Sequence, residues 1–294
     1  MIPTRGILTA LTTVLLACVP FAIRAQDTSS TANVRLTPAG RQAQLVLRDG
    51  STLLGRVVEV TPTTVRFVSV VGETSVPRSS IASVRLLNPS AMHDGEYWPE
   101  DPSRSRLFFA PTGRMLRRGE TYFADAYIFF PSVQVAVSDQ FTIGGGMSVF
   151  PVVAISDQIF YVTPKLGVYA SPTVNIAVGA LVAGARVFSD NSPAGIGYGV
   201  ATVGGEDASV TAGAGFGFEK GNASSTALLM LGGSQRVSRS IALVTENYLL
   251  SERGGGFLAS GGIRFMSEHI AVDLALFSPK FEIVVPYVAF IYRW

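Results

Sequence analysis

The sequence predicts an all-β protein: an antiparallel transmembrane β-barrel of about 12 strands, or alternatively about 10, preceded by a small five-stranded β-barrel module. Composition gives the first indication, because hydrophobic residues make up 48% of the chain and charged residues only 15%. A typical soluble domain has about 25% charged residues. After the N-terminal segment no apolar run reaches the roughly 18 residues that mark a helical span. The excess of apolar residues is therefore predicted to lie on strands.

The C-terminal segment gives the second indication, because its residues alternate. Side chains of a strand point to opposite faces with period two, so residues of one parity form one face. That face ends in three aromatic residues, Phe290, Tyr292 and Trp294, and Arg293 belongs to the opposite face. Transmembrane barrels carry such aromatic residues where their apolar outer face meets the lipid–water boundary. We therefore predict that these three residues lie at the membrane interface.

Segment lengths give the third indication. From Arg106 onward the chain divides at turn signals into thirteen candidate strands, many of them near the 9–11 residues of a tilted membrane strand. The candidates are 106–111, 120–130, 133–138, 140–150, 159–170, 173–188, 195–204, 207–219, 223–232, 238–250, 255–266, 268–277 and 283–294. The first and third are the weakest. Because bacterial single-chain barrels have an even number of strands, we expect about 12 strands, with about 10 as the alternative.

Residue parity predicts which face of each strand points outward. In 207–219 and 268–277 the apolar parity, including Val210 and Leu274, is predicted to face lipid. In 120–130 the same rule places the set that contains Tyr122, Ala124 and Ala126 outward. A soluble β-sandwich would carry more charged residues on its outer face.

Four charged residues then fall on inward positions of the last four strands, with alternating sign: Glu246, Arg264, Asp273 and Arg293. Pairing would stabilise such lumen-lining charges. They either form a ladder that fixes strand register and plugs the pore, or a polar lining that selects a solute. Small inward Gly and Ala residues favour a narrow or occluded lumen.

The N-terminus resembles a secretory signal peptide over residues 1–25, with the basic residue Arg5, an apolar stretch and Ala25 at the cleavage site. An alternative is a lipobox-like motif in which Cys18, the only cysteine, is lipidated. If the signal is cleaved after residue 25, the mature chain has no thiol for a disulfide or a metal site. Residues 26–41 are polar and aperiodic, which predicts a linker.

Residues 42–87 show five short strands, with turn signals at Asp49-Gly50 and around Gly72 and a bend or bulge expected at Gly55. The run LRDGSTLLGRVVEVTPTTVRFVS followed by VPRSSIASVRLL resembles Sm-like and SH3-like small barrels. Sm-like proteins often bind RNA, but the Asp and Asn residues of their RNA-binding loop have no clear match here. The net charge of +2 also gives no argument for nucleic acid. We expect a periplasmic module that packs or docks, followed by a proline-rich linker over 88–105.

The sequence offers little for catalysis, and we predict no enzyme, no cofactor and no metal site. The two histidines, His93 and His269, are far apart, which is unlike a metal site. Ser267, Glu268 and His269 are sequence neighbours at a turn, which is poor geometry for a catalytic triad. A membrane-embedded lipid-modifying enzyme that uses His269 is kept as an alternative.

Residues 104–294 resemble uncharacterised bacterial outer-membrane β-barrel proteins. The stretches that carry this resemblance include FYVTPKLGVYASP, GIGYGVATVGGEDASVTAGAGFGF and the terminal VPYVAFIYRW. The resemblance implies outer-membrane lipids and the barrel-assembly machinery as partners, with Phe290, Tyr292 and Trp294 as the assembly signal. It leaves the oligomeric state open. The expected function is a narrow channel, small-solute transport or a structural membrane role. A soluble secreted β-rich binding protein is the remaining alternative.

Overall fold

The computed structural model describes residues 42–69, 71–87, 91–93, 96–184, 194–219, 222–251 and 256–294. The chain forms two compact units, one ending at Leu86 and one spanning Leu87–Trp294, and each is described by itself. The predicted signal peptide 1–25, with Cys18, and the linker 26–41 lie outside the described residues.

The first unit is a five-stranded antiparallel sheet with the order β4-β3-β2-β1-β5. Its elements are β1 (Gln42–Leu47), β2 (Thr52–Val60), β3 (Thr64–Ser69), β4 (Gly72–Pro77), the short 3-10 helix η1 (Arg78–Ser80) and β5 (Ile81–Leu86). Alternate residues such as Leu45, Val65 and Phe67 are fully buried, so one face of the sheet forms an apolar core. At Gly55 an added Cβ would lie 2.1 Å from the Val68 carbonyl oxygen, whereas the strand irregularity comes later, between Val57 and Glu59.

The second unit is a closed antiparallel barrel whose wall contains twelve strand positions. The small hairpin β6 (Met92–His93) and β7 (Glu96–Tyr97) precedes it. The wall consists of β8 (Thr121–Ala126), β9 (Phe130–Ser138), β10 (Phe141–Met147), β11 (Phe160–Val162) with β12 (Lys165–Ala170), β13 (Val174–Gly184), β14 (Ala194–Gly204), β15 (Ala208–Glu219), β16 (Asn222–Ser238), β17 (Ile241–Leu250), β18 (Gly256–Met266), β19 (Ile270–Pro279) and β20 (Val285–Arg293).

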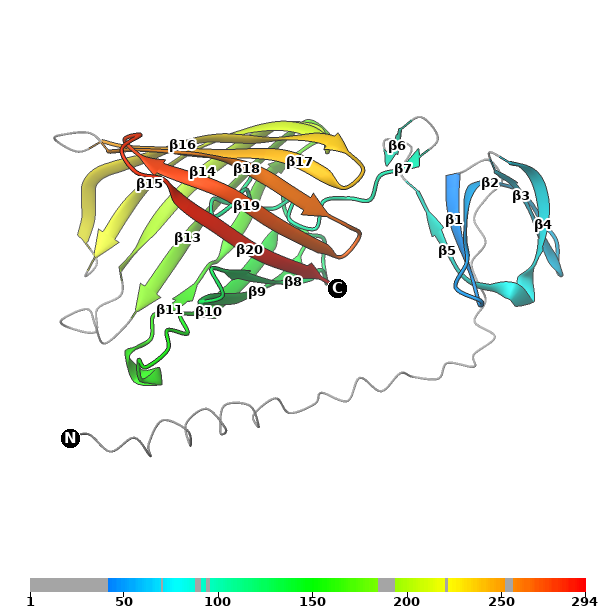
Figure 1. Cartoon of the computed structure of the whole chain (residues 1–294), viewed down its shortest axis with the longest axis horizontal. Coiled ribbons are helices and arrows are strands. Elements are labelled where there is room, and N and C mark those ends of the chain that lie inside the picture. The colour runs from blue at the N-terminus through cyan, green and yellow to red at the C-terminus, as the bar shows by residue number, and fades with distance from the viewer. Residues whose placement is uncertain are drawn as a thin grey trace. The chain divides into compact units, whose positions relative to one another are not determined.

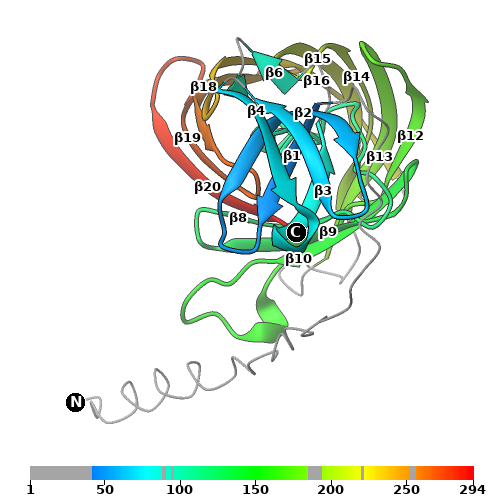
Figure 2. The same cartoon turned by 90° about the vertical axis from the view of Figure 1, so that its right-hand side faces the viewer.

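The barrel closes where its last strand, β20, pairs with its first, β8, through residue pairs such as Arg293 with Tyr122 (Figures 1 and 2). Strands β11 and β12 share one position, because both pair with β10 on one side and β13 on the other. Closure leaves no unpaired sheet edge, which is the condition that a sheet must meet to cross a lipid bilayer.

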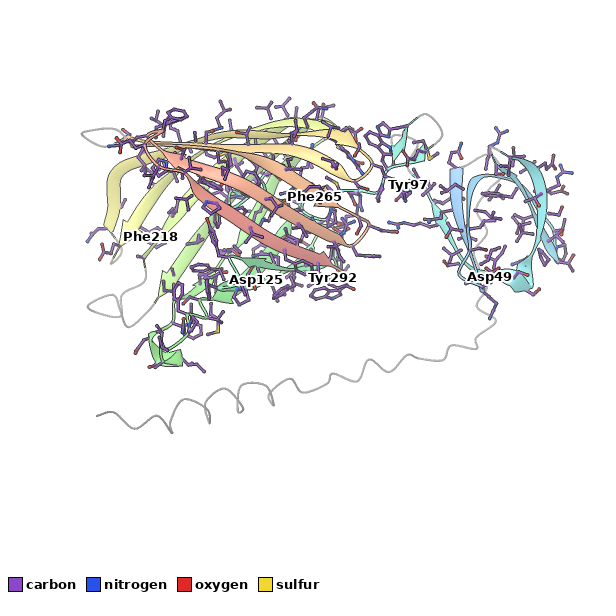
Figure 3. The ribbon with its side chains drawn as sticks, viewed as in Figure 1. Asp49, Tyr97, Asp125, Phe218, Phe265 and Tyr292 are labelled. Atoms are coloured by element: carbon purple, nitrogen blue, oxygen red, sulfur yellow. The ribbon has the colours of Figure 1, made fainter. Side chains whose placement is uncertain are left out.

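The outer face of the barrel is apolar. Large hydrophobic residues on it are about half exposed, among them Val210, Phe216, Leu274 and Tyr292, while most of their chain neighbours point inward and are buried. Figure 3 shows Tyr292 among the side chains on the strands of the barrel. A soluble monomer rarely exposes contiguous apolar surface on this scale, so the barrel has the surface of a membrane protein. No helix among the described residues is long and apolar enough to cross a membrane.

The prediction of about 12 strands is confirmed, as are the outward parities of 207–219, 268–277 and the terminal strand. The predicted strand 106–111 is wrong, because only an isolated bridge joins Arg106 to Pro111. The candidate 120–130 is interrupted by a turn in which Tyr127 and Ile128 have positive φ. Turns with this backbone usually carry Gly or Asn, and the aromatic and branched residues here conceal the turn.

The predicted face of β8 is also wrong. Tyr122, Ala124 and Ala126 point into the barrel and are buried. Both parities of this short strand contain an aromatic residue, so its pattern is ambiguous. Pairing decides the face: Tyr122 lies opposite Arg293, and residues opposite each other in a sheet point to the same side. Because Arg293 is inward, Tyr122 is inward too.

Candidate functional site: a plugged lumen with a cavity

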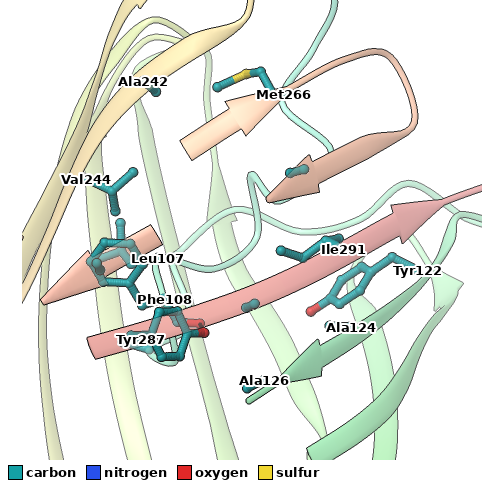
Figure 4. Close-up of a cluster of buried hydrophobic side chains, with 14 of the residues drawn as sticks. Leu107, Phe108, Tyr122, Ala124, Ala126, Ala242, Val244, Met266, Tyr287 and Ile291 are labelled. Carbon is teal, nitrogen blue, oxygen red and sulfur yellow. Dashed lines mark hydrogen bonds between the residues drawn. The ribbon is translucent and has the colours of Figure 1, made fainter. Parts of the chain in front are cut away.

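Residues 99–118, which we call the plug, run through the barrel interior between the small hairpin and the first wall strand. Leu107, Phe108 and Leu116 are at most 2% exposed and belong to the same apolar cluster as inward residues of the wall. Figure 4 shows Leu107 and Phe108 beside Tyr287 of β20, and the Phe108 and Tyr287 ring centres are 5.5 Å apart. Within residues 99–105, predicted to be part of a linker, Pro102, Ser103, Arg104 and Ser105 are buried as well.

Glu246 on β17 holds the plug backbone. Its Oε2 atom accepts hydrogen bonds from the N–H groups of Phe108, Phe109 and Ala110, at 2.8, 3.0 and 3.0 Å. Its Oε1 atom accepts one from the Tyr248 hydroxyl at 2.6 Å. Three successive N–H groups that converge on one oxygen form a strong site for an anion. The plug is not paired as a strand of the sheet, and the fully buried Glu246 carboxylate holds its backbone in place instead.

Arg264 on β18 makes the second anchor. Its guanidinium donates to both carboxylate oxygens of Asp273, at 2.7 and 3.0 Å, in a bidentate pair. It also donates to Asp101 at 2.8 Å and to the Leu107 carbonyl oxygen at 2.6 Å, both in the plug. Removing one partner of such a buried network costs about 3–5 kcal/mol, because the others are left unpaired.

Further polar contacts hold the plug along its length. Gly113 donates its N–H to the Thr202 hydroxyl at 2.8 Å, and an added Cβ at Gly113 would lie 2.0 Å from the Asn175 carbonyl oxygen. Only glycine allows the plug to pass so close to the wall. Arg236 donates to the Pro99 carbonyl oxygen at 2.7 Å. Proline residues of the plug lack the backbone N–H that strand pairing needs, and turn-favouring residues bend the chain. The plug therefore does not join the sheet.

Charged residues form a cluster at the barrel end where the plug meets the first strand. Arg104 pairs with Glu120 at 2.6 Å, and Arg293 and Arg117 each pair with Glu100, at 3.2 and 2.9 Å. Burial raises the pKa of the Glu120 carboxyl, but the Arg104 guanidinium, the Arg117 N–H and the Arg117 guanidinium together outweigh burial and hold that pKa below its ordinary value. This mouth cluster therefore favours the charged form of Glu120.

A cavity of about 350 Å³ remains between the plug and the wall from β8 to β14. It is partly open, and its lining includes residues near the barrel end opposite the charged cluster. Apolar and aromatic side chains predominate. The described lining residues are Ser105, Arg106, Phe109, Pro111, Tyr122, Ala124, Ala126, Phe130, Ser132, Gln134, Thr142, Ile159, Tyr161, Thr163, Lys165, Leu181, Ala183 and Tyr198. Its volume lies within the roughly 300–1,000 Å³ range of small-molecule sites.

The four charges predicted to line the lumen all lie inside the barrel: Glu246, Arg264, Asp273 and Arg293 are between 0% and 7% exposed. They do not form one continuous ladder. Arg264 pairs with Asp273 across adjacent strands, while Glu246 and Arg293 each contact the segment before β8. Parity identified these residues, but it could not show that their partners lie in the plug.

Phe290, Tyr292 and Trp294 lie on the outer face of β20, between 40% and 58% exposed, and the Tyr292 and Trp294 rings are 5.8 Å apart. Their role in assembly stays a prediction.

The residues considered for catalysis, Ser267 and His269, lie in the turn between β18 and β19. His269 Nδ1 lies 3.1 Å from the Arg293 carbonyl oxygen, and the Ser267 hydroxyl accepts the Ile270 N–H.

These contacts place Ser267 and His269 in the structure of a turn, with no hydrogen bond between their side chains in the part of the chain that is described. The first histidine, His93, stacks on Trp98 with ring centres 4.0 Å apart, and its Nε2 lies 2.8 Å from the Asp207 carboxylate. Among the described residues, no group of three or more His, Cys, Asp or Glu side chains is arranged to hold a metal ion.

No protein-family model matches the chain, and no curated protein matches it significantly. Solved structures similar to it include the KdgM porin, with 8% identity over 59% of this chain and 98% of that chain, at a TM-score of 0.47. The same porin in complex with disordered oligogalacturonate gives 8% identity and a TM-score of 0.45, covering 59% and 96% of the two chains. OmpF of Salmonella typhi in complex with daunomycin gives 8% and 0.32, covering 87% and 95%. At such scores these likenesses support no particular activity.

Proposed function

We propose that this chain is a bacterial outer-membrane protein that passes small solutes through a barrel closed at rest by its own plug. The supporting observation is the pair of features described above: a closed barrel with an apolar outer face, and a plug held in the lumen by Glu246 and Arg264. A closed barrel with an apolar band is one of the two architectures that can span a bilayer.

The connections between strands support an orientation. At the barrel end that carries Trp294, the five connections between β9 and β19 are two or three residues long. At the other end the connection between β10 and β11 covers residues 148–159. Outer-membrane barrels have short periplasmic turns and longer extracellular loops. We infer that the charged mouth cluster and the five-stranded unit face the periplasm, where that unit packs or docks.

The chemistry of the plug supports a gate rather than a purely structural filling. Apolar residues fill a core at least as stably as buried ion pairs do, because charges must lose their hydration. Here Asp101, Glu246 and Arg264 hold the plug through polar contacts, which can exchange for contacts with water or solute. The cavity beside the plug also means that the lumen is incompletely filled.

The location is tested by outer-membrane fractionation of the native protein, with gel mobility compared before and after boiling. Proteins of this type keep their barrel in detergent without heating, so a heat-dependent shift is the expected result. Release by carbonate and an unshifted band would contradict the proposal and favour a soluble secreted binding protein.

The gate is tested by planar-bilayer conductance of the wild-type protein and of a variant in which residues 101–113 are replaced by a Gly/Ser linker of equal length. We expect small, rare openings in the wild type and a steady, larger conductance in the variant. Equal conductance in two heat-modifiable proteins would contradict a gating plug.

A His269→Ala variant is the control for conductance, because it leaves the plug unchanged. The same variant tests the enzyme alternative, which an altered lipid composition of its membranes would favour.

A further inference from the structure

The cavity beside the plug has an unusual charge balance. Arg106 and Lys165 both line it, and among its described lining residues there is no Asp or Glu. The buried carboxylates of the lumen are engaged elsewhere: Glu246 accepts plug N–H groups and Asp273 pairs with Arg264. The cavity therefore carries two cations without a carboxylate on its own surface.

Both basic side chains belong to the cavity lining, and Lys165 bonds the plug backbone next to Arg106. The Lys165 ammonium donates to the carbonyl oxygen of Ser105, the residue just before Arg106, at 3.2 Å, and to that of Arg114 at 2.6 Å. An ammonium has three donors. Both observed acceptors are neutral carbonyls, so neither would balance a positive charge on the buried Lys165. A buried charge without a counter-charge is costly, which gives an anion a reason to bind.

Two buried polar atoms in the same lining have no hydrogen-bond partner, the Nε of Arg106 and the Oγ1 of Thr142. Thr142 on β10 lies directly opposite Lys165 on β12, so their side chains are neighbours on the inner face. Unpaired buried donors cost about 1–3 kcal/mol each and are rare in proteins. A ligand oxygen held by Lys165 would also offer an acceptor to the neighbouring Thr142 hydroxyl.

The rest of the lining is apolar. Leu181 on β13 points to the lumen and is nevertheless 40% exposed, and Ala183, Phe130 and Tyr198 continue the apolar surface toward the longer connections. An inward leucine with this much exposure leaves apolar side-chain surface uncovered inside the lumen. The cavity thus combines a cationic, donor-rich part with an apolar part.

We propose that this cavity binds an amphipathic monoanion, a small molecule with one carboxylate and an apolar tail. The carboxylate lies against Arg106, Lys165 and Thr142, and the tail lies along Leu181 and the aromatic side chains toward the open end. Charge-assisted hydrogen bonds are the strong ones in such sites. The inference rests on the proposed function, because it names the class of solute that the plugged lumen would take.

The test is equilibrium dialysis of the full-length protein in neutral amphipol against radiolabelled dodecanoate, with protein-free amphipol as the blank. Dodecanol and dodecyltrimethylammonium have the same tail with a neutral or a cationic head. We expect saturable dodecanoate binding, at least about tenfold weaker binding of dodecanol, and no saturable binding of the cation. Equal binding of dodecanoate and dodecanol would overturn the anionic site.

Four variants locate the site. Arg106→Gln should weaken dodecanoate binding about tenfold and Thr142→Val about threefold. Ala183→Trp should block the tail, and Arg118→Gln, which removes a cation outside the cavity, should change nothing. Arg106 is itself part of the plug and donates to the Tyr287 hydroxyl of the wall, so Thr142→Val is the decisive variant. The Thr142 hydroxyl has no partner, and its loss should leave the unliganded barrel as stable as the wild type.

Unchanged dodecanoate binding in Thr142→Val and Ala183→Trp would overturn the site. Absence of saturable binding to a protein that fractionates with the outer membrane and shifts on boiling would overturn this inference alone. A soluble protein with no mobility shift would instead overturn the proposed function.

Discussion

The two sides of the lumen differ in how they meet the plug. On the side of β17–β20, Glu246, Arg264 and Tyr287 make direct hydrogen bonds to plug backbone atoms. On the side of β8–β14, small or half-exposed residues such as Ala124 and Leu181 leave a cavity. The plug is thus bonded to both sides, because Lys165 and Thr202 also bond its backbone on the β8–β14 side. The cavity lies on that side, and the β17–β20 side is here called the attached side. Movement of the plug would not break the barrel, because the wall is held by its own strand pairing.

The largest effect is expected from breaking the attached side at Arg264. Arg264→Met leaves Asp273 and Asp101 buried without their partner, so we expect a loss of about 3–5 kcal/mol in the free energy of unfolding. Urea unfolding in micelles, followed by gel mobility, measures it. The double variant Arg264→Met/Asp273→Leu should recover part of the loss. A single variant as stable as the wild type would mean that the network does not hold the plug.

A matched pair of leucines compares the two sides directly. Leu107→Ala removes a side chain that is 1% exposed and should cost about 2–5 kcal/mol. Leu181→Ala removes one that is 40% exposed and should cost less than about 1 kcal/mol. The same unfolding measurement applies to both. Equal losses would show that the cavity side is packed as tightly as the attached side.

Glu246→Gln should weaken the attachment of the plug, although the plug should still lie in the lumen. An amide oxygen can still accept, but it lacks the charge that favours three converging N–H groups, so we expect a loss of about 1.5–3 kcal/mol. More frequent openings in planar bilayers should accompany it. Hydrogen exchange of Phe108, Phe109 and Ala110 is the direct measurement, and unchanged protection of these amides would contradict the anchoring role.

The smallest effect is expected from pH at the mouth cluster. The pKa of Glu120 is held below its ordinary value of 4.5, so its ion pair with Arg104 stabilises the fold at pH values above 4.5 and is lost as the pH falls below it. We expect a loss of about 1 kcal/mol between pH 7 and pH 3.5. Unfolding of the wild type and of Glu120→Gln at both pH values measures the difference. A pH dependence that is identical in the variant would exclude Glu120 as its source.

Much of the barrel could be predicted because its signal is local. The outward residues of β15 and β19 and the inward positions of Arg264, Asp273 and Arg293 follow from alternation within about ten residues. Prediction failed where alternation was weak or absent. In β8, Tyr122 and Phe123 give both faces an aromatic residue, and the turn at Tyr127 lacks the usual turn residues.

The plug escaped prediction for a different reason. Leu107, Phe108 and Phe109 form a short apolar run that is as typical of a buried strand as of a buried loop. Pro111 and Gly113 next to it were signals against a strand. They could indicate irregular backbone, but not where that backbone would be buried.

The sequence by itself determined the all-β class, the approximate strand number and the contrast between an apolar outer face and a charged inner face. All three depend on a period of two residues, which is a property of each strand alone. Only the tertiary structure decided that residues 99–118 lie in the lumen, which residues hold them there, and where space remains. The contact between Phe108 and Glu246 joins positions 138 residues apart, and no local pattern encodes a partner at that separation. It forms because barrel closure brings an unpaired backbone and a buried carboxylate to the same place, where each satisfies the other.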